Sequence, residues 1–164
     1  MRITLVCNCG LVLTHPEGTL LLDAVNGAYG GYCALPDAEY ARMQTGGYGK
    51  ICGILASHRH EDHYDAARVQ RLAERTGAPA FVPDAQTPAR VFARFGPFDV
   101  EFYRIPHMHL PDQPPCDHGV FVISDGARTI YAAADADPDP ETHRTVLAGR
   151  RIDAAFWSVP YLLY

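Results

Sequence analysis

Hydrophobic positions along the chain come in short runs separated by turn residues, a pattern typical of a protein with many strands. Near the N-terminus the pattern predicts an antiparallel meander of three strands, at residues 3–6, 10–14 and 19–23. Residues 51–57 form a continuous apolar run, which predicts a strand buried on both faces. Further strands are expected at residues 80–82, 99–105, 120–124, 129–133 and 152–159.

Helical periodicity is clearest at residues 66–76. Asp65 is suited to cap the first turn of this helix, and Gly77 is suited to end it. The apolar stripe of the helix consists of Ala66, Val69, Leu72 and Ala73. Its length and its two end signals together predict a helix packed against a sheet.

Other helices are expected at residues 36–44, with Pro36 at the first helical position, at residues 88–95 and at residues 141–147. Asp125 and Gly126 predict a tight turn that joins two of the later strands into a hairpin. Strands interspersed with helices predict mixed sheets covered by outer helices, and no linker divides the chain.

Composition limits the classes of partner. The chain has 164 residues, of which 48% are hydrophobic, and this is enough to form one core. A net charge of −5 makes nucleic acid an unlikely partner, because nucleic acids are bound through basic patches. No apolar stretch approaches the roughly 20 residues of a membrane span, and residues 1–6 are too polar for a signal peptide.

The five cysteines are scattered and form no C-x-x-C pair. We therefore expect no disulfide framework, and we expect the protein to be cytoplasmic. Cys7 and Cys9 are capable of ligating a metal, although small buried residues of a strand and turn are the commoner role for such cysteines.

His58, His60, Asp62 and His63 lie close together in an H-x-H-x-D-H pattern. In an extended segment, residues two apart project to the same side, so His58 and His60 can hold one ion together. Asp62 and His63 are placed to hold a second ion or to complete the first. Three imidazoles and one carboxylate are the donors that a divalent transition metal prefers.

Two loops rich in glycine and tyrosine flank this motif, at residues 26–32 and 46–49. Each is interpreted either as part of a lid that faces a substrate or as an ordinary surface connection, and the sequence favours neither. His15 lies beside Pro16 in a turn and is expected to be exposed. His143, within the helix predicted at residues 141–147, is expected to lie on the surface.

The segment at residues 54–65 resembles the signature of the metallo-β-lactamase superfamily, whose members are mostly metal-dependent hydrolases. The N-terminal strands with Asn8-Cys9-Gly10 and Leu21-Leu22-Asp23 are similar to that superfamily's opening, and residues 116–123 and 130–137 resemble its later motifs. The resemblance implies an α/β (α+β) fold, a four-layer αββα sandwich of two mixed sheets flanked by helices. It also implies that residues 1–164 form a single domain that lacks the last elements of this fold.

Carried over by position, the resemblance implies one metal ion held by His58, His60 and His118, and a second held by Asp62, His63 and Asp135. Asp135 would bridge the two ions. Asp62 would also orient a metal-bound water, whose pKa is drawn toward 7 so that it becomes the nucleophile. Zinc is the expected metal, as one or two ions, and manganese and iron are alternatives.

The third histidine has competing candidates, because His107 and His109 lie in the same loop as His118. We favour His118, which directly abuts a predicted strand. Ala134 stands where the superfamily has a glycine before Asp135. Superfamily members also continue further and supply another histidine, so the second ion is expected to lack one protein ligand, to be completed by water or to be absent.

These features predict a metal-dependent hydrolase of a small molecule, whose scissile bond is a lactone, ester, thioester, amide or phosphodiester. The alternative is a catalytically degenerate metal-binding module or interaction subunit. A di-iron oxidoreductase is a third hypothesis, for which the sequence offers no flavin-binding element. Apolar residues 157–164 predict an exposed strand edge and a homodimer that forms through it.

Overall fold

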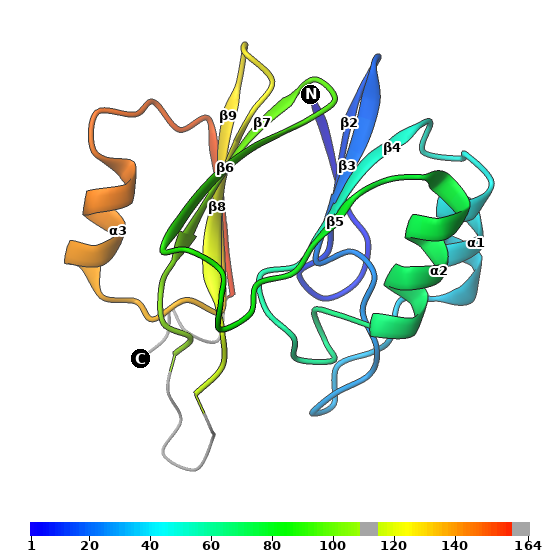
Figure 1. Cartoon of the computed structure of the whole chain (residues 1–164), viewed down its shortest axis with the longest axis horizontal. Helices are drawn as coiled ribbons and strands as arrows, with labels where there is room; N and C mark the ends of the chain where they lie inside the picture. The colour runs from blue at the N-terminus through cyan, green and yellow to red at the C-terminus, as the bar shows by residue number, and fades with distance from the viewer. Residues whose placement is uncertain (109–114, 159–164) are drawn as a thin grey trace. The chain divides into compact units, whose positions relative to one another are not determined.

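The chain forms two compact units, each containing one five-stranded sheet. The computed structural model describes residues 1–108 and 115–158 (Figure 1). The first unit comprises Met1–Val82 and Phe95–Pro97, and the second comprises Pro83–Arg94 and Phe98–Tyr164. No helix among the described residues is long and apolar enough to cross a membrane.

The sheet of the first unit has the order β1-β2-β3-β4-β5. Its antiparallel meander confirms the prediction and consists of β1 (Arg2–Leu5), β2 (Leu11–His15) and β3 (Gly18–Leu22). β4 (Ile51–Leu55) and β5 (Ala80–Phe81) extend it in parallel, because each follows a helical crossover. His15 was expected in an exposed turn but is the last residue of β2 and is half-buried.

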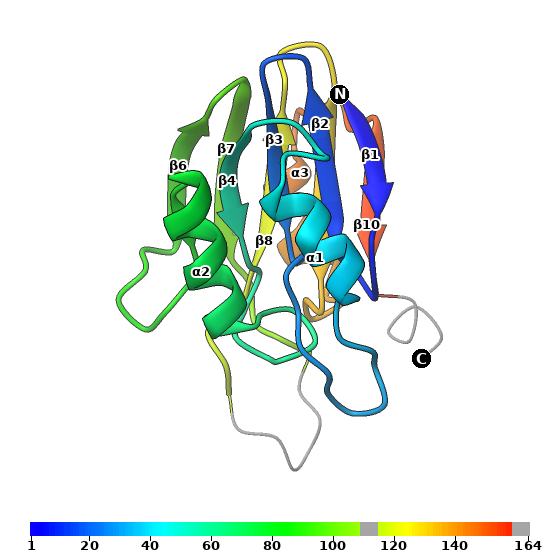
Figure 2. The ribbon, with the colours of Figure 1, turned by 90° about the vertical axis from the view of Figure 1, so that its right-hand side faces the viewer.

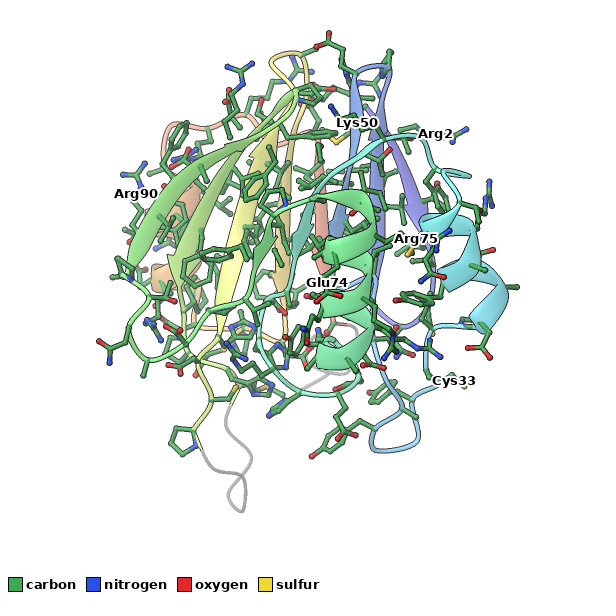
Figure 3. All side chains as sticks on the ribbon, turned by 45° about the vertical axis from the view of Figure 1, so that its right-hand side comes forward. Arg2, Cys33, Lys50, Glu74, Arg75 and Arg90 are labelled. Carbon is green, nitrogen blue, oxygen red and sulfur yellow. The ribbon has the colours of Figure 1, made fainter. Side chains whose placement is uncertain are left out.

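Two helices, α1 (Asp37–Gln44) and α2 (Ala66–Thr76), lie on one face of this sheet (Figures 1 and 2). α2 has the predicted bounds: the Asp65 carboxylate accepts from the Arg68 backbone N–H at 3.0 Å, and Gly77 ends the helix at φ 69°. Glu74 and Arg75, labelled in Figure 3, lie on its exposed side. Local signals therefore suffice to place this helix.

The start of α1 differs from the prediction by one residue. Pro36 has an extended ψ of 142° and occupies the N-cap rather than the first helical position. Its carbonyl oxygen still accepts from the Tyr40 backbone N–H at 3.0 Å, so Pro36 closes the first turn from outside the helix.

The sheet of the second unit has the order β10-β9-β8-β7-β6. Asp125 and Gly126 form the predicted turn between β8 and β9, with Gly126 at φ 84° and the Asp125 carboxylate accepting from the Arg128 N–H at 2.8 Å. α3 (Pro140–Leu147) lies on one face of the sheet and connects β9 to β10, which run parallel (Figure 1). The strands are β6 (Arg90–Phe95), β7 (Phe98–Arg104), β8 (Gly119–Ser124), β9 (Thr129–Ala134) and β10 (Ala154–Trp157).

The helix predicted at residues 88–95 is wrong, because this segment forms β6. Exposure alternates along it: the even-numbered residues from Arg90 to Arg94 are exposed, and Phe95 on the other face is buried. Phe92 is 65% exposed. The period-2 alternation and the turn at Gly96 decide in favour of a strand that pairs with β7.

His143 is buried, contrary to the prediction that it lies on the surface. The helix at this position is confirmed, but it turns His143 and Val146 inward. His143 Nε2–H donates to the Asp137 carbonyl oxygen at 2.7 Å, so Nδ1 carries the lone pair that accepts from the Tyr131 hydroxyl. His143 is thus a satisfied core residue that connects α3 to β9.

β10 is an edge strand of its sheet, as the predicted homodimer requires. Residues 159–164, which belong to the proposed dimer edge, lie outside the described residues. The homodimer therefore stays a prediction.

A charged network on the second unit gives a pH-dependent contribution to stability. Glu101 on β7 accepts two hydrogen bonds from Arg150, at 2.6 and 3.0 Å, and one from the Tyr103 hydroxyl at 2.7 Å. Arg90, labelled in Figure 3, adds an ion pair from β6. The hydrogen bonds from Arg150 are the largest cause that lowers the pKa of Glu101, from 4.5 to about 2.

We expect Glu101→Gln to lower the free energy of unfolding by about 2 kcal/mol near pH 7. The folded pKa lies below the unfolded value, so the carboxylate stabilises the fold above about pH 4.5, and this contribution is lost as the pH falls toward 2. Urea unfolding at several pH values measures it, with exposed Glu17→Gln as the control. A difference between wild type and Glu101→Gln that is the same at about pH 7 and pH 3 would contradict the assignment.

Candidate metal centre

The H-x-H-x-D-H motif begins three residues beyond the C-terminal end of β4, in the turn that leads to α2. Backbone bonds shape this turn: the His63 and Tyr64 N–H groups both donate to the His60 carbonyl oxygen, at 3.0 and 2.9 Å. The Asp65 N–H donates to the Val25 carbonyl oxygen at 2.8 Å and ties the turn to the end of β3. The turn gathers the four predicted side chains of the first unit: His58, His60, Asp62 and His63.

His58 and His60 point ring nitrogens at a common position. His58 Nε2 and His60 Nδ1 are 3.0 Å apart, and the rings meet edge-on. Two imidazole nitrogens bound to one tetrahedral zinc ion are separated by about 3.3 Å. The two rings are thus placed as a pair of ligands, as predicted, although the backbone at Ser57 and His58 bends rather than being extended.

A chain of buried polar groups orients His58. Asp23, directly after β3, accepts from the Ser57 backbone N–H at 2.7 Å and from the Ser57 hydroxyl at 2.8 Å. The Ser57 hydroxyl also lies 2.9 Å from His58 Nδ1. A partner on one ring nitrogen sets the direction of the other, so Asp23 and Ser57 direct His58 Nε2 toward His60.

Sequence analysis assigned no role to Asp23 or Ser57. One feature of the sequence could have indicated that Asp23 is buried: its carboxylate directly follows three hydrophobic strand residues, at positions 20–22. A charged group in such a place is buried only when it has polar partners. Asp23 and Ser57 are 3% and 1% exposed, respectively.

Asp62 is buried, and its two carboxylate oxygens differ. Oδ2 lies 3.8 Å from His63 Nε2, whereas Oδ1 has no hydrogen-bond partner among the residues that the structure describes. A buried carboxylate oxygen without a partner is costly unless a cation compensates it. The motif therefore fits a divalent metal: it combines two converging imidazoles with a carboxylate oxygen that needs a cation.

His63 lies between two carboxylates and a thiol. Its Nδ1 lies 3.1 Å from Asp23 Oδ2 and 3.2 Å from Cys9 Sγ, and its Nε2 faces Asp62. His58 and His63 are packed together, with ring centroids 4.1 Å apart. The sequence predicted His63 in this cluster, but it did not predict which thiol lies beside it.

The second unit holds the other predicted ligands. His118, directly before β8, is 1% exposed, and its Nδ1–H donates to the Ile105 carbonyl oxygen at 2.9 Å. His107 Nδ1–H donates in the same way to the Met108 carbonyl oxygen at 2.6 Å. A carbonyl oxygen only accepts, so each Nε2 carries the lone pair that a metal ligand requires.

His107 and His118 both remain candidates for the third histidine. Their ring centroids are 5.4 Å apart, and His107 Nε2 lies 3.6 Å from Asp135 Oδ2. His109 lies outside the described residues. The preference for His118 over His107 therefore stays a prediction.

Asp135 follows β9 through a strained residue. Ala134 has φ 46°, a left-handed conformation that a glycine adopts without strain. The Ser158 hydroxyl donates to Asp135 Oδ1, and the Met108 N–H donates to the Asp135 carbonyl oxygen at 2.8 Å. This left-handed conformation is unfavourable for alanine by about 1 kcal/mol or more. It places Asp135 beside His107.

The flanking loops differ in their relation to the motif. The loop at residues 26–32 is tied to it, because the Gly27 N–H donates to the Glu61 carbonyl oxygen at 2.6 Å. Its tip is a Tyr29–Tyr32 turn, and the Tyr29 ring is stacked on His60 with centroids 5.9 Å apart. The loop at residues 46–49 precedes β4 and so lies at the other end of that strand, as an ordinary connection.

No family model and no curated protein sequence matches the chain. Solved structures do match it. A mutant metallo-β-lactamase from Cronobacter sakazakii is 17% identical, with a TM-score of 0.62 over 95% of this chain and 76% of that one. A possible metal-dependent hydrolase from Veillonella parvula is 13% identical, with a TM-score of 0.58 over 90% of this chain and 67% of that one.

The diiron β-hydroxylase CmlA from Streptomyces venezuelae is also similar, at 17% identity and a TM-score of 0.62, over 93% of this chain and 33% of that one. Identities this low show the fold and leave the activity open. The predicted α/β (α+β) class, with two mixed five-stranded sheets and flanking helices, is confirmed. The chain has the metallo-β-lactamase fold.

Proposed function

We propose that the protein is a metal-dependent hydrolase that acts on a small molecule. The observation that carries this proposal is the buried Asp62 carboxylate, whose Oδ1 has no hydrogen-bond partner among the described residues. Asp62 follows His60 by two residues and His58 by four, and the ring nitrogens of these two histidines are paired. Structures with the same fold include a possible metal-dependent hydrolase, which supports the same class of reaction.

In this proposal His58 Nε2 and His60 Nδ1 hold the metal ion. Asp23 and Ser57 hold the His58 ring, so that no rotation is needed when the ion binds. A bound divalent metal lowers the pKa of a coordinated water and so supplies a nucleophile near neutral pH. Donors of this kind suit zinc, and also suit manganese or iron.

Asp62 has two roles in the proposed reaction. Asp62 would help His63 to hold a metal ion, and its carboxylate would also accept a hydrogen bond from the attacking water and orient it. The burial of Asp62 strengthens both interactions, because few water molecules compete with them. His118 and Asp135 are proposed to complete the ligand set, as the resemblance implies, and their own contacts are described within the second unit.

The loop at residues 26–32 is proposed to contact the substrate. Tyr29 and Tyr32 are 45% and 48% exposed, and the Tyr29 ring faces that of His60. Two exposed tyrosines beside a candidate ligand favour a substrate with an apolar or flat group near its scissile bond. The scissile bond itself is a lactone, ester, thioester, amide or phosphodiester, and a substrate panel is needed to choose among them.

Asp62→Asn tests the proposed chemistry. We expect it to lower kcat/KM for the best substrate of such a panel by about a hundredfold or more, because an amide lacks the negative charge that binds the metal and orients the water. Metal content is measured beside activity, and Glu61→Gln, an exposed neighbour, is the matched control. Full activity in Asp62→Asn, or turnover that survives a chelator, would refute the proposed hydrolase.

The same experiment separates the alternatives. Bound metal without turnover on any substrate would favour a metal-binding module instead of an enzyme. If the native metal is iron, oxidation reactions should be tested instead of hydrolysis, since the similar CmlA is a diiron β-hydroxylase.

A further inference from the structure

Three donors of different chemistry converge beside the His63 ring in the first unit. They are Cys9 Sγ, Asp23 Oδ2 and His63 Nδ1, and these ligand atoms all lie within 4.8 Å of one another. The Nδ1 atom is 3.2 Å from the sulfur and 3.1 Å from the carboxylate oxygen. Asp23 and His63 are both buried, and Cys9 is half-buried.

These separations agree with a tetrahedral metal site. With typical zinc–sulfur and zinc–nitrogen bonds, a thiolate and an imidazole nitrogen on one ion are about 3.6 Å apart. A carboxylate oxygen and an imidazole nitrogen are about 3.4 Å apart on the same ion. The observed distances are within about 0.4 Å of both values.

Several polar atoms lie close to the Nδ1 atom of His63. His63 Nδ1 has a single proton or lone pair, yet Cys9 Sγ, Asp23 Oδ2 and the Ser57 hydroxyl all lie within 3.4 Å of it. Asp23 is a buried carboxylate, and its ion pair among the described residues is with His63 rather than with a lysine or arginine. A cation among the three donors would satisfy them together.

The turn before β2 directs Cys9 toward His63. Cys7 and Asn8 both have positive φ, 119° and 41°, and the Asn8 side chain donates to the Cys33 carbonyl oxygen at 2.9 Å. Cys7 Sγ also donates to that carbonyl, at 3.2 Å. Of the two neighbouring cysteines, Cys9 is therefore the one whose sulfur meets the imidazole.

We propose that Cys9, Asp23 and His63 form a thiolate-containing binding site for a thiophilic divalent cation such as zinc. Water supplies the fourth ligand, and the Cys9 thiol releases its proton to solvent when the ion binds. This site goes beyond the proposed hydrolase, because its ligand atom on His63 is Nδ1, which lies closer to Cys9 Sγ than Nε2 does, at 3.2 Å against 3.8 Å. His63 is thus the residue that connects the two sets of donors.

Cobalt(II) tests the proposal, because a thiolate bound to cobalt gives a sulfur-to-metal charge-transfer band in the near ultraviolet. We expect the whole metal-free protein to develop this band on titration with cobalt(II). Cys9→Ser should abolish it. Cys33→Ser, at an exposed cysteine of the same unit (Figure 3), should retain it. No band in the wild type, or an unchanged band in Cys9→Ser, would overturn the proposed site.

A second measurement needs no variant. Bound zinc should slow alkylation of Cys9 in the wild-type protein by about tenfold or more, because the coordinated thiolate is a weaker nucleophile toward an alkylating reagent. Peptide mass spectrometry reports this rate for each cysteine, and exposed Cys33 is the internal reference. Equal alkylation of Cys9 with and without zinc would refute thiolate ligation.

The two proposals fail in different ways. His60→Ala removes the His58–His60 pair but leaves Cys9, Asp23 and His63 in place, so the thiolate band should persist in that variant. Loss of hydrolysis with a retained band would support the thiolate site alone. A band that disappears in His60→Ala would assign the sulfur to the His58–His60 ion and refute the proposed separate site.

Discussion

His60→Ala should remove the tightly bound metal from the His58–His60 position and lower kcat/KM by about a thousandfold. Replacing residues that only orient a ligand costs about 10–100-fold, and loss of a ligand itself should cost more. The paired nitrogens at 3.0 Å are the reason for expecting so large an effect, because a single imidazole cannot replace the pair. Metal content per chain, measured by mass spectrometry, is the primary readout.

Stability provides an independent check on the same variant. An ion present at a thousand times its Kd stabilises the fold by about 4 kcal/mol, so His60→Ala should lower Tm in the presence of metal. After chelation, the wild type and His60→Ala should unfold at nearly the same temperature. His15→Ala, a histidine at the end of β2, should match the wild type in both conditions. Unchanged metal content in His60→Ala would contradict the assigned ligand pair.

Asp23→Ala is expected to lower the free energy of unfolding by about 3 kcal/mol and to weaken metal binding by about 10–100-fold. Asp23 accepts from the Ser57 backbone N–H and hydroxyl and lies beside His63, and all of these groups are buried. Its removal leaves the Ser57 N–H without an acceptor and allows the His58 and His63 rings to rotate.

Urea unfolding of the metal-free protein measures the first effect, and metal titration measures the second. Asp99→Ala, at a half-exposed aspartate paired with Arg94 at 3.8 Å, should change stability by less than about 1 kcal/mol. Asp23→Ala with the stability of the Asp99 control would show that the polar chain through Ser57 contributes little. Cys9→Ser separates the two roles of Asp23, because it removes the thiolate and leaves the hydrogen bonds between Asp23 and Ser57 in place.

Elements with strong local signals were predictable in detail. The helix at 66–76 has a cap residue, an apolar stripe and a terminating glycine, so its bounds agree with the structure. The same holds for the hairpin at Asp125 and Gly126. The segment at 88–95 was misassigned because Val91, Phe92 and Phe95 also have helical spacing, and only pairing with β7 reveals that alternate residues are exposed.

Burial of single polar residues was less predictable. His143 was expected on the surface because a histidine in a helix is usually solvated, yet its partners on β9 and at Asp137 make burial favourable. Helical periodicity in a sequence identifies which residues share one face of the helix. It does not identify which hydrogen-bond partner a distant strand supplies to that face.

The sequence by itself determined the H-x-H-x-D-H cluster, because its four donors lie within a few residues and the local backbone sets their directions. Only the tertiary structure decided how these donors are held and which thiol joins them. Asp23 and Ser57 meet because β3 and β4 are parallel neighbours, with Leu22 opposite Leu55. Cys9 reaches His63 across 54 positions of sequence. Such contacts depend on strand register and chain closure, which no local pattern encodes.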